Sequence, residues 1–387
     1  MPTPESPSGD AVTLAAIGFD SRVEALFKDT PRPAGGDAVL GRISRVDRGS
    51  SIVLLEGETT RAELNHELQQ LAALGNAAAL PAAGDWVAVT RRPEHAFDVI
   101  EAILPRTSAF IRRAIEAGGD SSARVRPQVM ATNVDIAFLV AAATDTRAAR
   151  LERLGMVAWE SGAAPVVVLT KADLVVDPSA AYRAAEEALP DVPIYLVDSV
   201  HREGIEAVRA LLYADRQPGE GHRTAVFLGA SGVGKSTLTN ALVGSEVLDT
   251  GAVREGDGRG RHTTTARHLV ALPGGGALID TPGIRSIAAW GAAESVELVF
   301  PEIEALALEC RFRDCEHEHE PDCAVQAAIA SGELDSKRLE RFRRVEREQS
   351  REATKSDPLV QADLVAGRKR INRWLKGRTD VRRKRGG

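Results

Sequence analysis

Residues 229–236 carry the pattern that bears most directly on chemistry. They fit G-x-x-x-x-G-K-[ST] and end in Lys235 and Ser236. Glycines let the backbone N–H groups of such a loop curl around phosphate oxygens, the lysine reaches the β- and γ-phosphates, and the hydroxyl ligates Mg²⁺. The residues that we expect to hold the phosphates are Gly229, Ala230, Ser231, Gly232, Val233, Gly234, Lys235, Ser236 and Thr237.

The flanks of this loop fit the elements that must position it. The apolar run 225–228 predicts a strand, and residues 236–243 predict a helix. A phosphate loop needs this layout, because the helix N-terminus adds partial positive charge beside the phosphates. The alternative is a glycine-rich turn that binds no nucleotide, and the two flanks argue against it.

A second loop, upstream of the first, fits the recognition of guanine. Residues 170–173 follow the apolar run 165–169, which predicts a buried strand, and read Thr-Lys-Ala-Asp, similar to N-K-x-D. The Asp173 carboxylate can accept two hydrogen bonds from guanine, which adenine does not offer, and Lys171 would pack along the base. Thr170 replaces the usual Asn, so we expect it to remove an amide that braces neighbouring loops and to lower guanine affinity.

A third loop follows the next predicted strand, residues 193–197. Ser199 and Val200 open a segment that ends at Gly204 and is similar to the loop that contacts the guanine carbonyl. Either base loop alone is equally compatible with a solvated turn. Two in succession, each after a strand and separated by one helix, indicate a guanine site.

Switch elements of a GTPase are predicted downstream of Lys235. Residues 259–265 read Arg-Gly-Arg-His-Thr-Thr-Thr, in which Thr265, or else Thr264, would close on Mg²⁺ and the γ-phosphate. Asp280 opens D-T-P-G after the run 276–279, so Asp280 would hold Mg²⁺ through water and the Gly283 amide would meet the γ-phosphate.

The residue after this motif bears on the rate of hydrolysis. Many GTPases have Gln there to orient the attacking water, whereas this chain has Ile284. We therefore expect slow intrinsic hydrolysis, with the water oriented by His262 or by a group from a partner. A solvated switch histidine is an equally good interpretation of His262.

The order of the motifs is base loops, phosphate loop, then switches, whereas ordinary GTPases begin with the phosphate loop. This order predicts a circularly permuted GTPase with a doubly wound parallel sheet. The site survives permutation because it depends on spatial order at the strand ends, not on chain order.

A cysteine and histidine cluster predicts one structural zinc ion. The three cysteines of the chain all lie in the pattern C-x₄-C-x-H-x₅-C. Three thiolates and an imidazole make a closed tetrahedral zinc site, whereas disulfides are disfavoured by the odd number and by the absence of a signal peptide. His319 and Asp322 are spare candidates. The predicted ligands are Cys310, Cys315, His317 and Cys323.

Length and charge agree with a multidomain protein. The 387 residues suggest two or three domains. No apolar run is long enough to span a bilayer and the N-terminus lacks a secretory core, so we expect no membrane association and a cytoplasmic location. The net charge is −6, yet residues 367–387 hold ten Lys/Arg and one acid, leaving 39 basic and 54 acidic residues before them. Such an arm suggests contact with nucleic acid phosphates, or else a solvated tail.

The expected organisation has five parts. Short β-like runs at 39–43, 51–55, 85–90 and 98–103 predict a small barrel, most plausibly an OB-fold that binds RNA, or else a structural cap. The expected segments are a flexible lead with one helix near Ser21–Lys28 (residues 1–36), the barrel (37–112), the permuted GTPase domain (113–290), a helical zinc-binding domain (291–357) and a basic tail (358–387).

These features together resemble the ribosome small-subunit-dependent GTPase family, RsgA. The resemblance rests on G-x-S-G-V-G-K-S, G-R-H-T-T-T, D-T-P-G and the cysteine cluster, and covers residues 37–345. It implies a cytoplasmic GTPase, here expected to be a monomer, that hydrolyses GTP to GDP late in 30S ribosomal subunit maturation. It also implies stimulation by the 30S particle and binding of 16S rRNA by the barrel and zinc domains.

Two other function classes stay open. A nucleotide-gated RNA-binding switch with incidental turnover is compatible with Ile284. An enzyme that uses ATP at the phosphate loop is opposed by Asp173 and by the Ser199–Gly204 loop. Turnover of GTP with and without 30S particles discriminates the first class from an enzyme that 30S particles stimulate.

Overall fold

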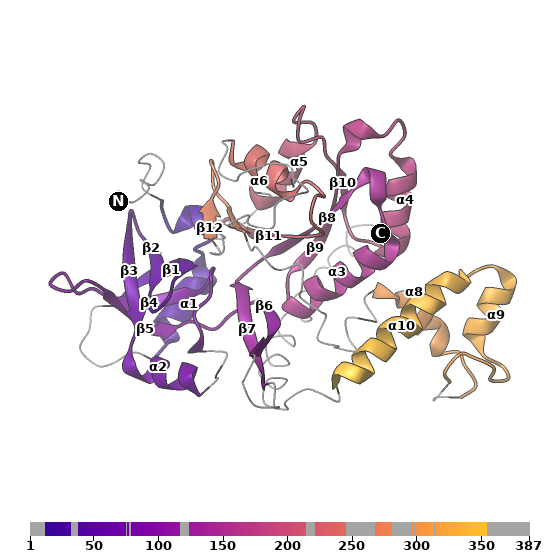
Figure 1. Ribbon diagram of the computed structural model, residues 1–387, viewed down its shortest axis with the longest axis horizontal. Helices are drawn as coiled ribbons and strands as arrows, with labels where there is room; N and C mark the ends of the chain where they lie inside the picture. Colours follow the sequence, from indigo (N-terminus) through magenta and orange to yellow (C-terminus); the bar gives the residue numbers. More distant parts are fainter. Residues whose placement is uncertain are drawn as a thin grey trace.

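The computed structural model places a β-barrel, a mixed α/β sheet and a helical C-terminal region side by side (Figure 1). The structure describes residues 12–31, 38–74, 76, 79–116, 124–213, 221–244, 268–280, 296, 299–312 and 315–353. In this part of the chain, no helix has the length and apolar character required to cross a membrane.

The barrel is closed and five-stranded, in the order β1-β2-β3-β5-β4. β3 and β5 pair in parallel and the other neighbours pair antiparallel. One helix, α2, lies between β3 and β4 in the chain, as in an OB-fold. Its elements are β1 (Ala38–Val46), β2 (Ser51–Leu55), β3 (Glu58–Leu64), α2 (His66–Ala73), β4 (Trp86–Thr90) and β5 (Asp98–Ile103).

Four of these strands coincide with the runs expected from the sequence, and β3 is additional. β3 reads Glu-Thr-Thr-Arg-Ala-Glu-Leu, and only Ala62 of it is buried. Its pairing with β2 and β5, rather than its own apolar content, makes it a strand. The barrel core is closed by Ile43, Val53, Leu55, Ala62, Val87, Val89 and Ile100.

The central sheet has six strands in the order β10-β9-β8-β11-β13-β12. Five of them run parallel, and β12 pairs antiparallel with β13 at one edge. The strand at the centre, β8, is buried along its whole length, which explains its continuous apolar sequence. The strands are β8 (Ile136–Ala142), β9 (Ala164–Thr170), β10 (Ile194–Leu196), β11 (Thr224–Leu228), β12 (His268–Ala271) and β13 (Ala277–Asp280).

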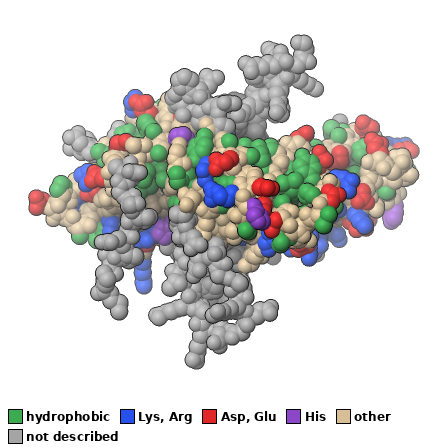
Figure 2. Space-filling view, turned by 90° about the horizontal axis from the view of Figure 1, so that it is seen from above, with side chains coloured by type: hydrophobic (Ala, Val, Ile, Leu, Met, Phe, Trp, Pro, Cys, Tyr) green, Lys and Arg blue, Asp and Glu red, His purple; other side chains and the backbone are tan. Residues whose placement is uncertain are grey.

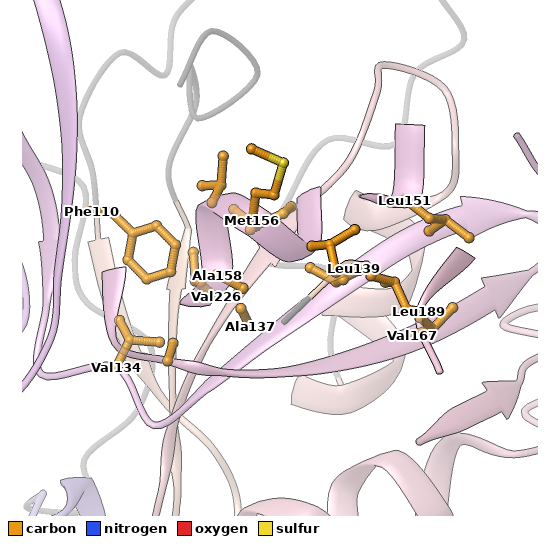
Figure 3. Packing of buried hydrophobic residues seen from close by; sticks show 14 of the residues in the cluster. Phe110, Val134, Ala137, Leu139, Leu151, Met156, Ala158, Val167, Leu189 and Val226 are labelled. Carbon is orange, nitrogen blue, oxygen red and sulfur yellow. The ribbon is translucent and has the colours of Figure 1, made fainter. Parts of the chain in front are cut away.

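Helices cover both faces of this sheet, so the doubly wound fold is confirmed, with an antiparallel edge strand added (Figure 1). On one face Ala137 and Leu139 of β8 pack with Met156 and Ala158 of a helix (Figure 3). On the other face, alternate residues of β8 such as Phe138 pack with two helices that follow later in the chain. The helices are α3 (Ala148–Ser161), α4 (Ser179–Ala188), α5 (Ile205–Tyr213) and α6 (Lys235–Val243).

The N-terminal segment corrects one expectation. A helix, α1 (Ser21–Asp29), is present where one was expected, and the Asp20 side chain caps it by accepting from the Val23 N–H. However, Leu14, Ile17 and Val23 are buried in the same core cluster as α3. Residues 12–31 therefore pack against the body and do not form a flexible lead, because their apolar side chains have a surface to cover.

A buried arginine of the barrel fastens this segment in place. The Arg42 guanidinium donates to the carbonyl of Ile17, to Gly84 O at 3.2 Å and to Asn133 O at 3.2 Å, and lies 4.9 Å from the centre of the Trp86 ring. Burial lowers the pKa of Arg42 to about 10. One side chain thus joins the N-terminal segment, the barrel and the start of the sheet domain.

A hairpin of β6 (Ala109–Glu116) and β7 (Arg124–Thr132) lies between the barrel and α3 (Figure 1). The expected domain limit between residues 112 and 113 falls inside β6, so the hairpin spans it. The other domain limits remain predictions.

The C-terminal region is helical, as expected, and docks on α3 through buried charges. It contains α8 (Pro301–Ala307), α9 (Ala324–Ser331) and α10 (Ser336–Ala353). The Arg338 and Arg341 guanidinium groups donate to the same Glu152 oxygen at 2.6 and 2.8 Å, and the Glu152 side chain is only 2% exposed. Arg338 also donates to Ala188 O at 3.1 Å and stacks on Phe300. A carboxylate of α3 therefore holds two arginines of α10.

Replacing Glu152 by Ala should lower the free energy of unfolding by about 3–5 kcal/mol, because two guanidinium groups lose their shared buried carboxylate. Urea unfolding followed by circular dichroism measures this. The control is Glu187→Ala on α4, at an exposed position, which should change stability by less than about 0.5 kcal/mol. Equal effects of the two variants would show that the buried carboxylate does not hold the regions together.

Candidate functional site

Four strands end at one edge of the sheet, and each is followed by a predicted site loop. β9 and β10 pair in parallel with Leu169 opposite Leu196, and β11 and β13 pair in parallel with Val226 opposite Ile279. β8 joins these two pairs. The carboxyl ends of parallel strands face the same way, so the base loops, the phosphate loop and Asp280 lie along one edge, where open α/β sheets bind ligands.

The phosphate loop has the backbone that its glycines predict. A Cβ on Gly229 would lie 2.5 Å from Val140 O, so a side chain cannot fit there. Gly232 and Gly234 have φ of 77° and 97°, and Gly234 caps α6. Lys235 begins α6, and its ammonium group donates to Gly229 O at 2.9 Å and Ala230 O at 2.5 Å. The lysine charge therefore lies over the loop.

The rest of the loop divides into anchors and exposed groups. The Val233 side chain is buried in the core cluster beside α5 and α6 and fixes the loop to the sheet. Ser231 and Ser236 are exposed, and Ser236 lies in the first turn of α6. An exposed hydroxyl there is accessible to an Mg²⁺ ion that accompanies a bound phosphate.

The first base loop leaves β9 through a buried threonine. The Thr170 hydroxyl donates to Val233 O of the phosphate loop at 2.5 Å and lies 3.2 Å from Ala141 O. The Thr170 hydroxyl thus contacts the phosphate loop although the amide of the usual Asn is absent, and the lower guanine affinity expected for Thr170 remains a prediction. Lys171 has φ of 56°, and Asp173 is exposed on the short 3₁₀ turn Ala172–Leu174 that follows.

The second base loop is held by Asp198, a residue that sequence analysis did not single out. Its buried carboxylate accepts from the N–H groups of Val200 at 2.8 Å and His201 at 3.1 Å, and from the His201 ring. The Asp198 N–H donates to Glu203 O at 3.0 Å. A Cβ on Gly204 would lie 2.2 Å from Leu196 O, which explains the glycine that ends the motif.

Two further groups of this loop differ in exposure. Val200 is 72% exposed, and the buried Ser199 hydroxyl oxygen has no hydrogen-bond partner among the described residues. The hydrogen bond to Asp198 raises the pKa of His201, and the nearby Asp173 carboxylate acts in the same direction. An Asp three residues before a His was the only sequence signal for this pair.

Asp280 ends β13, next to the strand that leads into the phosphate loop, and lies opposite His268 of β12. Burial lowers the pKa of His268. His262, Thr264, Thr265, Gly283 and Ile284 lie outside the described residues, so their switch roles remain predictions.

The ligand atoms of Cys310, Cys315, His317 and Cys323 all lie within 4.8 Å of one another. His317 Nδ1 is 3.6 Å from the sulfurs of Cys310 and Cys323, and these sulfurs are 3.9 Å apart. A tetrahedron with zinc–sulfur bonds of ~2.3 Å and a zinc–nitrogen bond of ~2.0 Å has sulfur–sulfur edges of about 3.8 Å and sulfur–nitrogen edges of about 3.5 Å. The sulfurs are too far apart for a disulfide, and the group can hold a metal ion.

Neighbouring residues orient this group. The carbonyl of His317 accepts hydrogen bonds from Gln326 of α9 and Arg343 of α10. The Glu320 carboxylate accepts hydrogen bonds from its own backbone N–H and from those of Glu316, Glu318 and His319. These bonds lower the pKa of Glu320 to about 2 and close the loop. The spare candidates lie elsewhere, since His319 is exposed and Asp322 pairs with Arg311 at 2.9 Å.

Comparison with known proteins identifies the family. The sequence profile described as RsgA GTPase matches residues 103–290. A small ribosomal subunit biogenesis GTPase RsgA of Streptomyces avermitilis is 42% identical, over 99% of this chain and 98% of that protein. A protein of the same name from Opitutus terrae is 40% identical, over 94% and 96%.

Two solved structures share the fold. YjeQ from Thermotoga maritima has a TM-score of 0.55 at 22% identity, over 81% of this chain and 98% of that chain. YloQ, a circularly permuted GTPase, has a TM-score of 0.56 at 23% identity, over 83% and 98%. The site at the carboxyl edge and the similarity of 40–42% identity over nearly the full length to the Streptomyces avermitilis and Opitutus terrae proteins lead to one conclusion: the chain belongs to the RsgA family of GTPases.

Proposed function

We infer that this protein is a GTP hydrolase that acts in the biogenesis of the small ribosomal subunit. The observation that carries this inference is the meeting of base loops, phosphate loop and Asp280 at one sheet edge, in a chain that is 42% identical over nearly its full length to a protein of that function.

The residues divide into three roles in this proposal. Asp173 and Lys171 bind guanine, with Thr170, Ser199 and Val200 shaping the base pocket. The phosphate loop binds the phosphates through backbone N–H groups and Lys235. Ser236 and Asp280, with Thr265 closing, would hold Mg²⁺, which neutralises charge on the phosphates when bound. Catalysis is positioning and charge stabilisation, without a covalent intermediate.

We propose that Ile284 makes intrinsic GTP hydrolysis slow. An apolar side chain cannot orient water, so His262 or a group from the partner does so. The resemblance to the RsgA family implies that this partner is the 30S ribosomal subunit, late in its maturation, and that it stimulates turnover. The same residue favours the second candidate, a nucleotide-gated RNA-binding switch with incidental hydrolysis.

We propose that 16S rRNA is bound by the barrel, the C-terminal helical region and the basic segment 367–387, in a cytoplasmic monomer. The face of the molecule in Figure 2 shows basic and acidic side chains interspersed rather than one large basic surface. On that face, local phosphate contacts at several sites fit the mixture of charges better than a single basic surface does.

We propose one structural zinc ion at the cluster of Cys310, Cys315, His317 and Cys323. Its support is the sulfur and nitrogen separations, which fit tetrahedral zinc, and the soft thiolate donors. Four protein ligands leave no open position for catalysis, so the ion would stabilise the C-terminal region.

Turnover of GTP should rise at least about a hundredfold on addition of purified 30S subunits, because a partner group would orient the water that Ile284 cannot. Steady-state phosphate release with and without 30S measures this, with 50S subunits as the control. A wild-type rate that 30S leaves unchanged, together with nucleotide-dependent 30S binding, would favour the switch protein instead.

Lys235→Ala should lower turnover by about 10²–10³-fold and weaken GTP binding, because the phosphates lose a charged donor. Phosphate release and a fluorescent-nucleotide titration measure the two effects. Lys337→Ala, at an exposed position of α10, is the control for loss of a lysine. Full activity in the Lys235 variant would remove the phosphate loop from the mechanism.

The purified protein should contain about one zinc ion per chain, and Cys315→Ser should lose it, because three ligands hold zinc poorly. Metal analysis by mass spectrometry measures this, and GDP binding should persist because the sheet domain has its own core. His319→Ala, which removes the exposed spare histidine, should keep its zinc. A zinc-free wild-type protein, or loss of zinc in the His319 variant alone, would refute the assignment.

A further inference from the structure

Arg202, in the second base loop, has a backbone that suits glycine better than a long side chain. Its φ of 65° lies in the left-handed region, which glycine adopts at lower cost. The side chain extends away from the loop, and its Nη2 donates to Ala241 O at 3.1 Å. Ala241 lies in the last turn of α6, so this contact joins the second base loop to the helix that follows the phosphate loop.

The end of α6 offers acceptors for this arginine. The last four carbonyls of a helix have no partner within it, and they carry the negative end of the helix dipole. The Gly244 N–H donates to Asn240 O at 2.9 Å. Arg209 of α5 donates to Ala241 O at 3.2 Å and to Leu242 O at 2.7 Å. Two guanidinium groups therefore meet at one helix end, one from α5 and one from the base loop.

Internal hydrogen bonds allow the base loop to be positioned as a unit. The Asp198 carboxylate accepts from two backbone N–H groups of the loop, and the Asp198 N–H donates to Glu203 O at 3.0 Å. Arg202 lies inside the segment that these bonds close, and α6 holds it from outside. The contact of Arg202 therefore sets how far Ser199 and Val200 stand from the helix.

The helix is a firm support because it is anchored along its length. Its buried residues are Leu238, Thr239, Ala241 and Leu242. Lys235, whose ammonium group lies over the phosphate loop, is its first residue. One helix thus carries the phosphate-loop lysine at its beginning and the acceptor of Arg202 in its last turn.

We propose that Arg202 is a positioning residue that seats the second base loop on the end of α6 and so sets the contact of that loop with the carbonyl group of guanine. The proposal rests on the proposed guanine-nucleotide site. Because the same helix begins at Lys235, Arg202 places the loop relative to the phosphates and not to the sheet alone. Arg209 shares an acceptor with Arg202 but lies outside the loop, so it caps α6 without placing the loop.

The test compares the two arginines that share this acceptor. Arg202→Ala releases the base loop from α6, whereas Arg209→Ala removes more hydrogen bonds from the same helix end and leaves the loop held. Arg183→Ala, at an exposed position of α4, is the control for loss of an arginine. Calorimetry measures the affinity of each full-length variant for GDP, thioguanosine diphosphate and inosine diphosphate.

These nucleotides separate the contacts of the base. In thioguanosine, sulfur, a weak acceptor, replaces the carbonyl oxygen, while the N–H groups that Asp173 would bind remain. The ratio of GDP affinity to thioguanosine diphosphate affinity therefore reports the contact made by the second base loop. Inosine keeps the carbonyl and lacks the exocyclic amine, so the ratio of GDP affinity to inosine diphosphate affinity reports the contact made by Asp173.

We expect Arg202→Ala to lower the ratio of GDP to thioguanosine diphosphate affinity about three- to fivefold, because the carbonyl loses a well-placed donor. The ratio of GDP to inosine diphosphate affinity should keep its wild-type value, since Asp173 belongs to the other base loop. Arg209→Ala should keep both ratios and lower the midpoint of thermal unfolding. A general loss of stability would weaken all of the nucleotides in proportion and would move neither ratio.

Three outcomes overturn the proposal: an unchanged ratio of GDP to thioguanosine diphosphate affinity in Arg202→Ala, an equal fall of that ratio in Arg209→Ala, or a ratio near one in the wild type. If Arg202→Ala fails to fold, Arg202→Gly, which suits the left-handed backbone, takes its place with the same expected ratios. A wild-type protein that binds none of the nucleotides contradicts the proposed site itself, which separates that failure from a failure of the positioning role.

Discussion

The site depends on one constraint of parallel sheets: every strand in such a sheet delivers its carboxyl end to the same edge. β9, β10, β11 and β13 obey it and are neighbours or near neighbours in the sheet. The loops that follow them can therefore meet whatever their order in the chain. Permutation changes the order of the loops along the chain without moving this edge, which is why a chain whose base loops precede its phosphate loop still brings them to one site.

A second requirement is that the barrel, the sheet domain and the C-terminal region keep fixed relative positions. Two buried guanidinium groups fulfil this requirement. The Arg42 guanidinium donates hydrogen bonds to carbonyls of the N-terminal segment, the barrel and the sheet domain. The Arg338 guanidinium donates to the Glu152 carboxylate of α3, to the Ala188 carbonyl at the end of α4 and to the Val299 carbonyl at the start of the C-terminal region. Buried charges are costly unless every donor is satisfied, so each network favours one arrangement over its neighbours.

The motifs could be predicted from the sequence because their geometry is local. The glycines of the phosphate loop, the apolar runs of β9 and β11, and the spacing of Cys310 and Cys323 each depend on residues close in the chain. No such signal marks Arg42, Glu152 and Arg338. Their partners are distant in sequence, and an isolated charged residue is normally predicted to lie on the surface. The same holds for β3, a polar strand made by its neighbours, and for Thr170, whose role depends on where Val233 O lies.

The strand at the edge of the sheet extends the same logic to the barrel. β12 pairs only with β13 among the described strands, with His268 opposite Asp280. On its other side the Ser44 hydroxyl of β1 donates to Leu269 O at 3.4 Å, at a point where a bulge shifts the register of β1. A bulge turns a side chain out of the regular ladder, and here it turns one towards β12. The barrel is thus hydrogen-bonded to β12, the strand that pairs with the one carrying Asp280.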